Sequence, residues 1–156
     1  MKTLIISLSL LLTFYGCNLH DDSSNNSTPT HKTVISDEVE FTLDIPKNSF
    51  LLDDTLSIIF KFRNRSTSKK EFYISDISEV AYQLIDPNGY IATYYPNIGE
   101  PHRNNLTLEP DQLWQFPLIG FFKDVHGNYI DRGKYSLFVF LASNNSPKLK
   151  LEITVN

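Results

Sequence analysis

The sequence predicts an all-β, immunoglobulin-like antiparallel β-sandwich of about seven or eight strands with no disulfide. Three observations support this fold class. Apolar and polar residues alternate with a period of two in several short runs, turn-forming residues separate the runs, and no window keeps a helical period over three turns. The only cysteine, Cys17, lies near the N-terminus, which excludes an internal disulfide.

Composition narrows the class of protein further. The chain has 156 residues and a mass of 17.9 kDa, which suits one ordinary domain. Its 41% hydrophobic and 21% charged residues are typical of a globular protein. The net charge of −4 argues against a nucleic-acid-binding protein, which is usually basic. With one cysteine and four scattered histidines, we expect no metal and no cofactor.

Residues 1–16 predict a signal peptide. Lys2 supplies the positive charge, and the uncharged, mostly apolar run from Leu4 to Tyr15 is shorter than the about 20 residues that a membrane-spanning helix needs. The next residues, Phe14-Tyr15-Gly16-Cys17, resemble the bacterial lipobox. That resemblance implies cleavage before Cys17 and a diacylglyceryl and palmitate anchor on its sulfur. The protein would then be a lipid-anchored membrane protein of the bacterial cell envelope, facing the periplasm or the cell surface.

The segment 17–36 is interpreted as the lipidated cysteine followed by a flexible tether, with the folded domain at 37–156. Residues 18–30 hold one aliphatic side chain, Leu19, which cannot build a core. The pair Asp21-Asp22 resembles the export signals of some surface-exposed lipoproteins, although a solvated linker accounts for the same residues.

The strands of the domain follow from their alternation. One face of each run is apolar and the other polar, as in half-buried strands. The runs are Val39 to Ile45, Leu56 to Phe62, Trp114 to Leu118 and Leu149 to Val155. A further run, Tyr135 to Ala142, is apolar on both faces, which predicts a central strand.

Two local motifs are interpreted as structural. Asp86-Pro87-Asn88-Gly89 predicts a hairpin between strands 80–86 and 90–95, because Pro87 presets one turn residue and Gly89 can take a positive φ. Asp131-Arg132-Gly133-Lys134-Tyr135 resembles the tyrosine corner of immunoglobulin-like domains, in which the tyrosine hydroxyl bonds a nearby backbone group. We therefore assign structural roles to Gly89, Asp131, Gly133 and Tyr135.

Several motifs also occur together in an ordered series. They are Phe62-Arg63-Asn64-Arg65-Ser66, Phe72-Tyr73-Ile74, Tyr82 to Gly89, Leu106 to Pro110 and Gly133-Lys134-Tyr135. Together they resemble the BsuPI-type domain, named for an intracellular proteinase inhibitor of Bacillus, over roughly residues 38–142. The resemblance implies a sandwich fold and serine protease inhibition. It provides no reactive-site residue, and Asp111 stands where a glycine usually follows the proline.

No catalytic motif stands out in the sequence. There is no Gly-x-Ser-x-Gly elbow and no Gly-rich phosphate loop. Asp124-Val125-His126-Gly127 could orient an imidazole, but we interpret it as a polar turn. A metal held by His102 and His126 would need carboxylates to complete its shell, and nothing in the spacing demands such a site. We therefore expect no enzymatic activity.

Two long loops, 91–105 and 119–132, are the predicted binding elements. Their aromatic and arginine residues have the composition of interface hot spots and would also suit stacking on sugars. In the alternative, the aromatic rings fold back to cap the core. The candidates are Tyr94, Tyr95, His102, Arg103, Phe121 and Phe122. Three functions stay open: a protein-binding module, with a protease as one partner; a carbohydrate- or envelope-binding module; and a structural accessory of an envelope complex.

Overall fold

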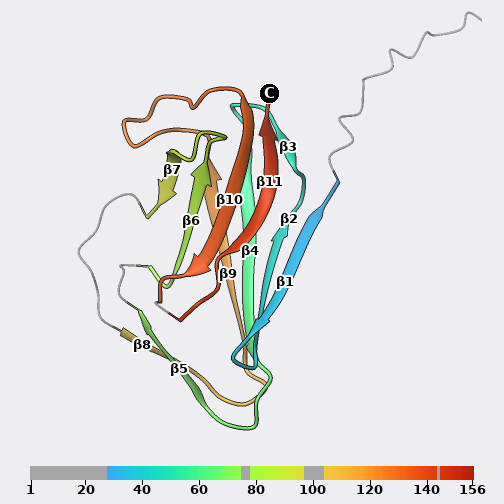
Figure 1. The fold of residues 1–156 in the computed structure, drawn as a ribbon, viewed down its shortest axis with the longest axis vertical. Helices are drawn as coiled ribbons and strands as arrows, with labels where there is room; N and C mark the ends of the chain where they lie inside the picture. The colour runs from blue at the N-terminus through green and yellow to red at the C-terminus, as the bar shows by residue number, and fades with distance from the viewer. Residues whose placement is uncertain (1–27, 75–77, 97–103, 144) are drawn as a thin grey trace, which may run out of the picture.

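The computed structural model describes residues 28–74, 78–96, 104–143 and 145–156, and these form an all-β sandwich (Figure 1). The predicted signal peptide, Cys17, His102 and Arg103 lie outside the described residues. Within the described ranges, no helix has the length and apolar character needed to cross a membrane.

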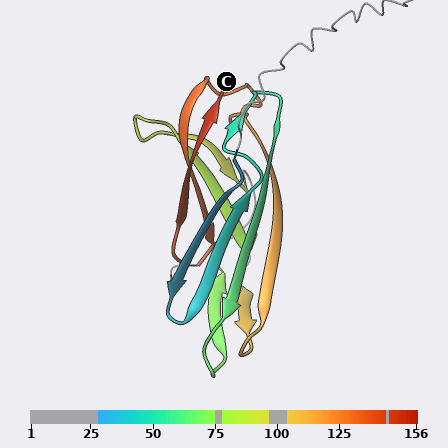
Figure 2. The same ribbon diagram turned by 90° about the vertical axis from the view of Figure 1, so that its right-hand side faces the viewer.

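One layer of the sandwich is a four-stranded antiparallel sheet, whose strands lie side by side in Figure 2. Because β1 and β9 are its outermost strands, each has one edge that no strand of this sheet covers. In order across the sheet, the strands are β1 (Thr30–Ser36), β2 (Val39–Ile45), β4 (Thr55–Asn64) and β9 (Leu113–Phe121).

The second layer is a five-stranded sheet, in which β10 occupies the central position that its apolar sequence predicts. Its strands, in order, are β3 (Ser49–Phe50), β11 (Leu149–Val155), β10 (Gly133–Leu141), β6 (Val80–Ile85) and β7 (Ile91–Tyr95). The short β3 runs parallel to β11, the one exception to antiparallel pairing among the described strands. A separate pair, β5 (Lys70–Ile74) and β8 (Asn104–Leu108), lies at the lower end in Figure 1.

The core fills the space between the two main sheets. Alternate residues of β2, β4, β10 and β11 are buried there, as the period of two predicts. Its aromatic centre is a set of packed rings that includes Phe41, Phe60 and Phe62, each no more than 1% exposed. No disulfide is needed to hold this core together.

The predicted hairpin joins β6 to β7. The Asp86 carboxylate accepts hydrogen bonds from the backbone N–H groups of Asn88 and Tyr90, at 2.9 and 2.8 Å. Gly89 has a φ of 88°, which a residue with a Cβ rarely adopts. At the other predicted motif, the Tyr135 hydroxyl donates to the Asp131 carbonyl at 2.7 Å, and Gly133 opens β10.

The folded domain begins earlier than the sequence indicated. β1 lies inside the segment 17–36 that we interpreted as tether, and it pairs with β2 along its whole length. The pattern was hard to read because β1 is an edge strand with mostly exposed or half-buried side chains, among which only Val34 packs on the core. The described residues hold eleven strands rather than seven or eight, since the short β3, β5 and β8 carry too few residues to show a period.

Candidate functional site

The predicted loops meet at one flank of the sandwich. There β7, the outermost strand of the five-stranded sheet, and β9, the outermost strand of the four-stranded sheet, enclose a cavity of about 400 Å³. We call this cavity the flank groove. It is lined by Tyr82, Thr93, Tyr94, Tyr95, Ile119, Phe121, Lys123, Asp124, Val125 and Gly127.

Tyr94 and Tyr95 reach the groove from a strand, not from a loop. They are the last residues of β7 and lie opposite Gln83 and Tyr82, so residues 91–95 follow the predicted strand 90–95 and do not belong to the predicted loop 91–105. The Tyr95 ring stacks on the Tyr82 ring at 5.6 Å between centroids and 6° between planes. Because 38% of Tyr95 is still exposed, the pair forms an aromatic wall that a ligand can reach.

Phe121 and Phe122 have opposite environments. Phe121 ends β9, so the predicted loop 119–132 is likewise shorter at its start, and 57% of its side chain is exposed. Phe122 is fully buried, with its ring 5.2 Å from that of Phe50. As a binding residue Phe122 is therefore wrong, because neighbouring residues at a strand end point to opposite sides.

Tyr82 forms the inner wall of the groove and was not a candidate from the sequence. It belongs to β6, yet its hydroxyl is hydrogen-bonded by the backbone of Phe121 in the opposite sheet. Burial raises the pKa of Tyr82 to about 12, although that hydrogen bond acts in the other direction. The sequence did hold one signal for Tyr82. It is a tyrosine at a buried position of a predicted strand, where its hydroxyl needs a hydrogen-bond partner.

A turn after β9 closes the end of the groove. The Asp124 carboxylate accepts hydrogen bonds from the backbone N–H groups of His126 and Asn128, both at 2.9 Å. The bonds from Asn128 and His126 lower the pKa of Asp124. The turn is attached to β7 because the Thr93 hydroxyl donates to the Lys123 carbonyl. These contacts account for Asp124 as a turn residue, and the His126 side chain is exposed to solvent.

The exposed face of β9 is unusually apolar for an outermost strand. Its inward residues Trp114, Phe116 and Leu118 pack on the core, as the sequence predicted. Its outward positions include Leu113, Ile119 and Phe121, which are 55%, 64% and 57% exposed. A strand that faces solvent normally alternates apolar with polar residues. Apolar side chains on both faces therefore make the outer surface of β9 a candidate for contact with another molecule.

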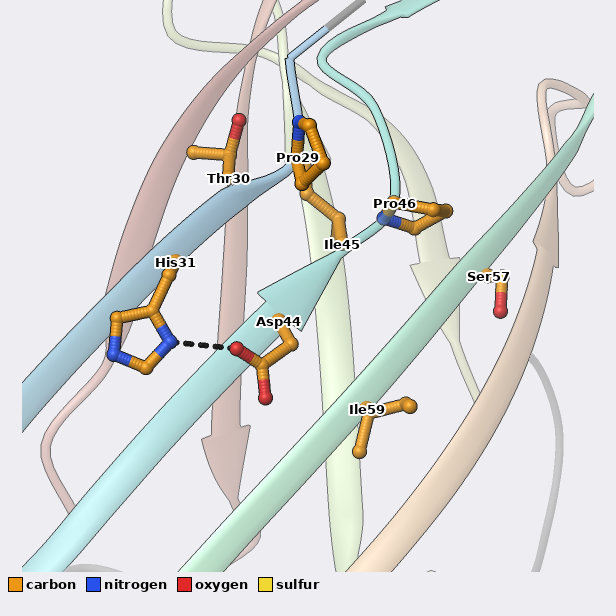
Figure 3. Close-up of a pocket in the computed structure, with 8 residues that line it drawn as sticks. All are labelled: Pro29, Thr30, His31, Asp44, Ile45, Pro46, Ser57 and Ile59. Carbon is orange, nitrogen blue, oxygen red and sulfur yellow. Dashed lines mark hydrogen bonds and ion pairs between the residues drawn. The ribbon is translucent and has the colours of Figure 1, made fainter.

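A second hollow, of about 310 Å³, lies over β1, β2 and β4 (Figure 3). Its polar side is an array in which His31 Nδ1 is 2.6 Å from Asp44 Oδ1 and His31 Nε2 is 2.8 Å from the Thr33 hydroxyl. Lys61 Nζ donates to the other Asp44 oxygen at 2.9 Å. The lining residues are Pro29, Thr30, His31, Asp44, Ile45, Pro46, Ser57 and Ile59.

The array of the second hollow has a structural explanation. Its members are direct cross-strand neighbours, because His31 lies opposite Asp44 and Thr33 lies opposite Thr42. The hydroxyl–imidazole–carboxylate order is also that of hydrolytic triads. Here, however, Lys61 holds the carboxylate, and the His31 side chain is 62% exposed on an open sheet face. We assign the array to holding β1 in register on β2.

No metal-binding cluster is present in the described ranges. Three or more histidine, cysteine, aspartate or glutamate side chains do not converge anywhere among those residues. We take the residues of the flank groove as the candidate ligand site.

No protein-family model and no curated protein sequence matches the chain. Among solved structures, it is similar to the Pseudomonas fluorescens alkylpurine DNA glycosylase AlkC bound to DNA, at 12% identity and a TM-score of 0.51, over 76% of this chain and 30% of that one. A β-glucosidase from Erythrobacter marinus matches at 16% identity and a TM-score of 0.47, over 82% of this chain and 16% of that one. The sporulation control protein Spo0M of Bacillus subtilis matches at 11% identity and a TM-score of 0.49, over 76% of this chain and 49% of that one.

The chain spans less than half the length of each of these proteins. At 12% identity, the likeness to the glycosylase concerns the fold alone.

Proposed function

We propose that this chain is a lipid-anchored protein of the bacterial cell envelope whose β-sandwich binds another protein through the flank groove. The observation that carries the proposal is the set of exposed apolar side chains around the groove. Ile119, Phe121 and Val125 are 64%, 57% and 65% exposed, and Tyr95 and Tyr129 add two aromatic rings. Clustered exposed apolar surface is typical of protein interaction sites.

The chemistry of the groove favours a protein over a sugar. Sugar-binding sites combine aromatic platforms with polar groups that point at hydroxyls. Here the Thr93 hydroxyl and the Asp124 carboxylate are already hydrogen-bonded within the protein. Aliphatic residues such as Ile119 and Val125 make up much of the remaining exposed rim. Carbohydrate binding is the alternative that the experiment below separates.

Membrane attachment would place the groove outside the cytoplasm. The signal peptide and lipobox resemblance at residues 1–17 support this location. The segment 18–27, before the first described residue, would act as the spacer between the lipid and the sandwich. A lipid-anchored domain of this kind binds its partner at the membrane surface.

Proteinase inhibition is the most specific form of this proposal. It rests on the BsuPI-type resemblance of residues 38–142. Titration of the detergent-solubilised protein into subtilisin- and trypsin-like proteases tests it. Stoichiometric loss of protease activity with the titrant intact on a gel supports inhibition, whereas full activity or cleaved titrant rejects it and leaves the broader binding function standing.

Site-specific photocrosslinking tests protein binding itself. A photoreactive benzoylphenylalanine replaces Phe121 in cells that make the protein, and in a matched strain it replaces Ile35. Ile35 is 65% exposed but lies on β1, at the opposite side of the four-stranded sheet. We expect a discrete protein adduct from position 121 that Tyr95→Ala removes, and none from position 35.

Two results would reject protein binding at the groove. One is the absence of any adduct at position 121, and the other is equal crosslinking at 121 and 35. Retention of the protein on a glycan resin, abolished by Tyr95→Ala, would instead support the carbohydrate-binding alternative.

A further inference from the structure

We infer that the partner segment that enters the flank groove carries an aromatic side chain next to a carboxylate. This inference rests on the proposed function and adds the chemistry of the partner. It follows from three features of the groove: a lysine without an ion pair, its apolar walls and the main chain of β9.

The two charged residues of the groove are not paired with each other. They are Lys123 and Asp124. Asp124 is engaged by its own turn, where it also accepts a bond from the Asn128 side-chain amide at 3.3 Å. Lys123 forms no ion pair with any described residue, and its ammonium lies 4.9 Å from the Tyr129 ring centroid. A carboxylate that enters the groove therefore meets a cation without an acidic partner.

The apolar walls provide a place for an aromatic ring. The Tyr82–Tyr95 stack forms one side, and Ile119 and Phe121 form the other. Aromatic rings gain from such neighbours beyond the area they bury, and they lose little conformational freedom on binding. Lys123 lines the groove together with these walls, so an acidic residue adjacent to the aromatic one would lie near it.

The main chain of β9 disfavours binding by addition of a further strand. The Gln112 carbonyl accepts a bond from the Asn64 N–H, on the side of β4. Because backbone groups alternate in direction along an antiparallel strand, Pro117 and Ile119 face the opposite, open edge. Pro117 has no N–H to offer, and proline at an edge hinders strand pairing. Recognition along β9 must therefore depend on side chains.

Fluorescence anisotropy tests this inference with three labelled peptides and the full chain in an uncharged detergent. The peptides are Gly-Ser-Phe-Glu-Ser and its counterparts with Gln or Lys in place of Glu. We expect the Glu peptide to bind about three- to tenfold more tightly than the Gln peptide, and the Lys peptide to bind most weakly. High salt should reduce this preference because it screens the charge of Lys123.

Two variants and a matched control locate the effect. Lys123→Met should abolish the preference for Glu, whereas Phe121→Ser should weaken the Glu and Gln peptides equally. Lys148→Met is the control, because Lys148 also lies on an aromatic ring, 4.4 Å from the Phe140 centroid, but on the five-stranded sheet away from the groove. It should leave all three affinities unchanged.

Equal binding of the three peptides, no binding of the Glu peptide, or a preference that survives Lys123→Met would overturn the inference. If crosslinking at position 121 still captures a protein in that case, the proposed function stands and only the acidic chemistry of the partner is rejected. If crosslinking also fails, both proposals fall.

Discussion

The phenol ring of Tyr82 lies directly over Gly120, and together they join the two sheets at the flank groove. Tyr82 comes from β6 and Gly120 from β9, in opposite layers of the sandwich. A Cβ at position 120 would lie 2.8 Å from Tyr82 Cζ and closer still to the hydroxyl oxygen. Glycine is therefore required at this position for close approach and not for its backbone angles.

Gly120→Ala should destabilise the fold because the added methyl group forces the Tyr82 ring to move. Overpacking of this kind costs about 1–3 kcal/mol. Urea denaturation of the full chain would measure the loss. The double variant Gly120→Ala with Tyr82→Leu should lose clearly less free energy of unfolding than the sum of the two single variants, since the smaller side chain removes the clash. Additive losses would show that the contact between Tyr82 and Gly120 is not the cause.

A buried asparagine should matter as much as a core apolar residue. Asn64 is fully buried, and its amide donates to the carbonyls of Ser68 and Leu108 at 2.7 and 3.1 Å. Its side-chain oxygen accepts from both the backbone and the hydroxyl of Ser66. Asn64→Leu removes these four bonds from a buried site, so we expect a loss of about 2–4 kcal/mol in the free energy of unfolding.

The exposed Asn88 provides the control for Asn64. Its own side chain makes one long bond, at 3.4 Å to Asp86, so Asn88→Leu should cost less than about 1 kcal/mol. Similar losses for Asn64→Leu and Asn88→Leu in parallel urea titrations would contradict the role assigned to Asn64.

The strands that the sequence predicted well are those with one face in the core. β2, β4 and β11 bury alternate side chains, so apolar and polar residues alternate in their sequences with a period of two. β1 was not predicted because its contacts are cross-strand polar pairs, such as His31 with Asp44. These pairs depend on strand register and produce no alternation of apolar and polar residues in the sequence.

The candidate site was less predictable than the fold. Tyr95 and Phe121 were found from composition, but their convergence depends on β7 and β9 ending on the same flank. Tyr82 belongs to a third strand and reaches the site through its hydrogen bond with the backbone of Phe121 in the other sheet. No local sequence pattern predicts such a contact between sheets. Phe121 is exposed and Phe122 is buried, and predicting this difference would have required the exact residue at which β9 ends.

Cys17→Ser should detach the protein from the membrane, because serine cannot form the thioether of a lipoprotein anchor. Cells grown with radiolabelled palmitate should label the natural protein and not the variant. Fractionation should then find the natural protein in the membrane pellet, where the proposed acyl chains would contribute about 0.8 kcal/mol per buried CH₂. Equal palmitate labelling of both proteins would exclude Cys17 as the lipidation site.

The Asp44 array should make stability depend on pH in acid. Burial by itself raises the pKa of Asp44, but hydrogen bonds from His31 and Lys61 outweigh it and leave the pKa below its usual value. A carboxyl whose pKa is lower in the folded than in the unfolded state stabilises the fold above the unfolded pKa of about 3.9. That contribution is lost as the pH falls through the folded pKa.

Asp44→Asn should therefore lower the free energy of unfolding near neutral pH, by about 1 kcal/mol or less since the pair is partly exposed. The difference from the natural protein should shrink as the pH falls below about 4 and disappear once the pH is below the folded pKa of Asp44. Urea titrations at a series of pH values would measure it. Asp53→Asn serves as the control, because Asp53 is exposed and forms no ion pair with any described residue. A difference for Asp44→Asn that stays constant across this range would mean that its carboxylate charge does not hold β1 on β2.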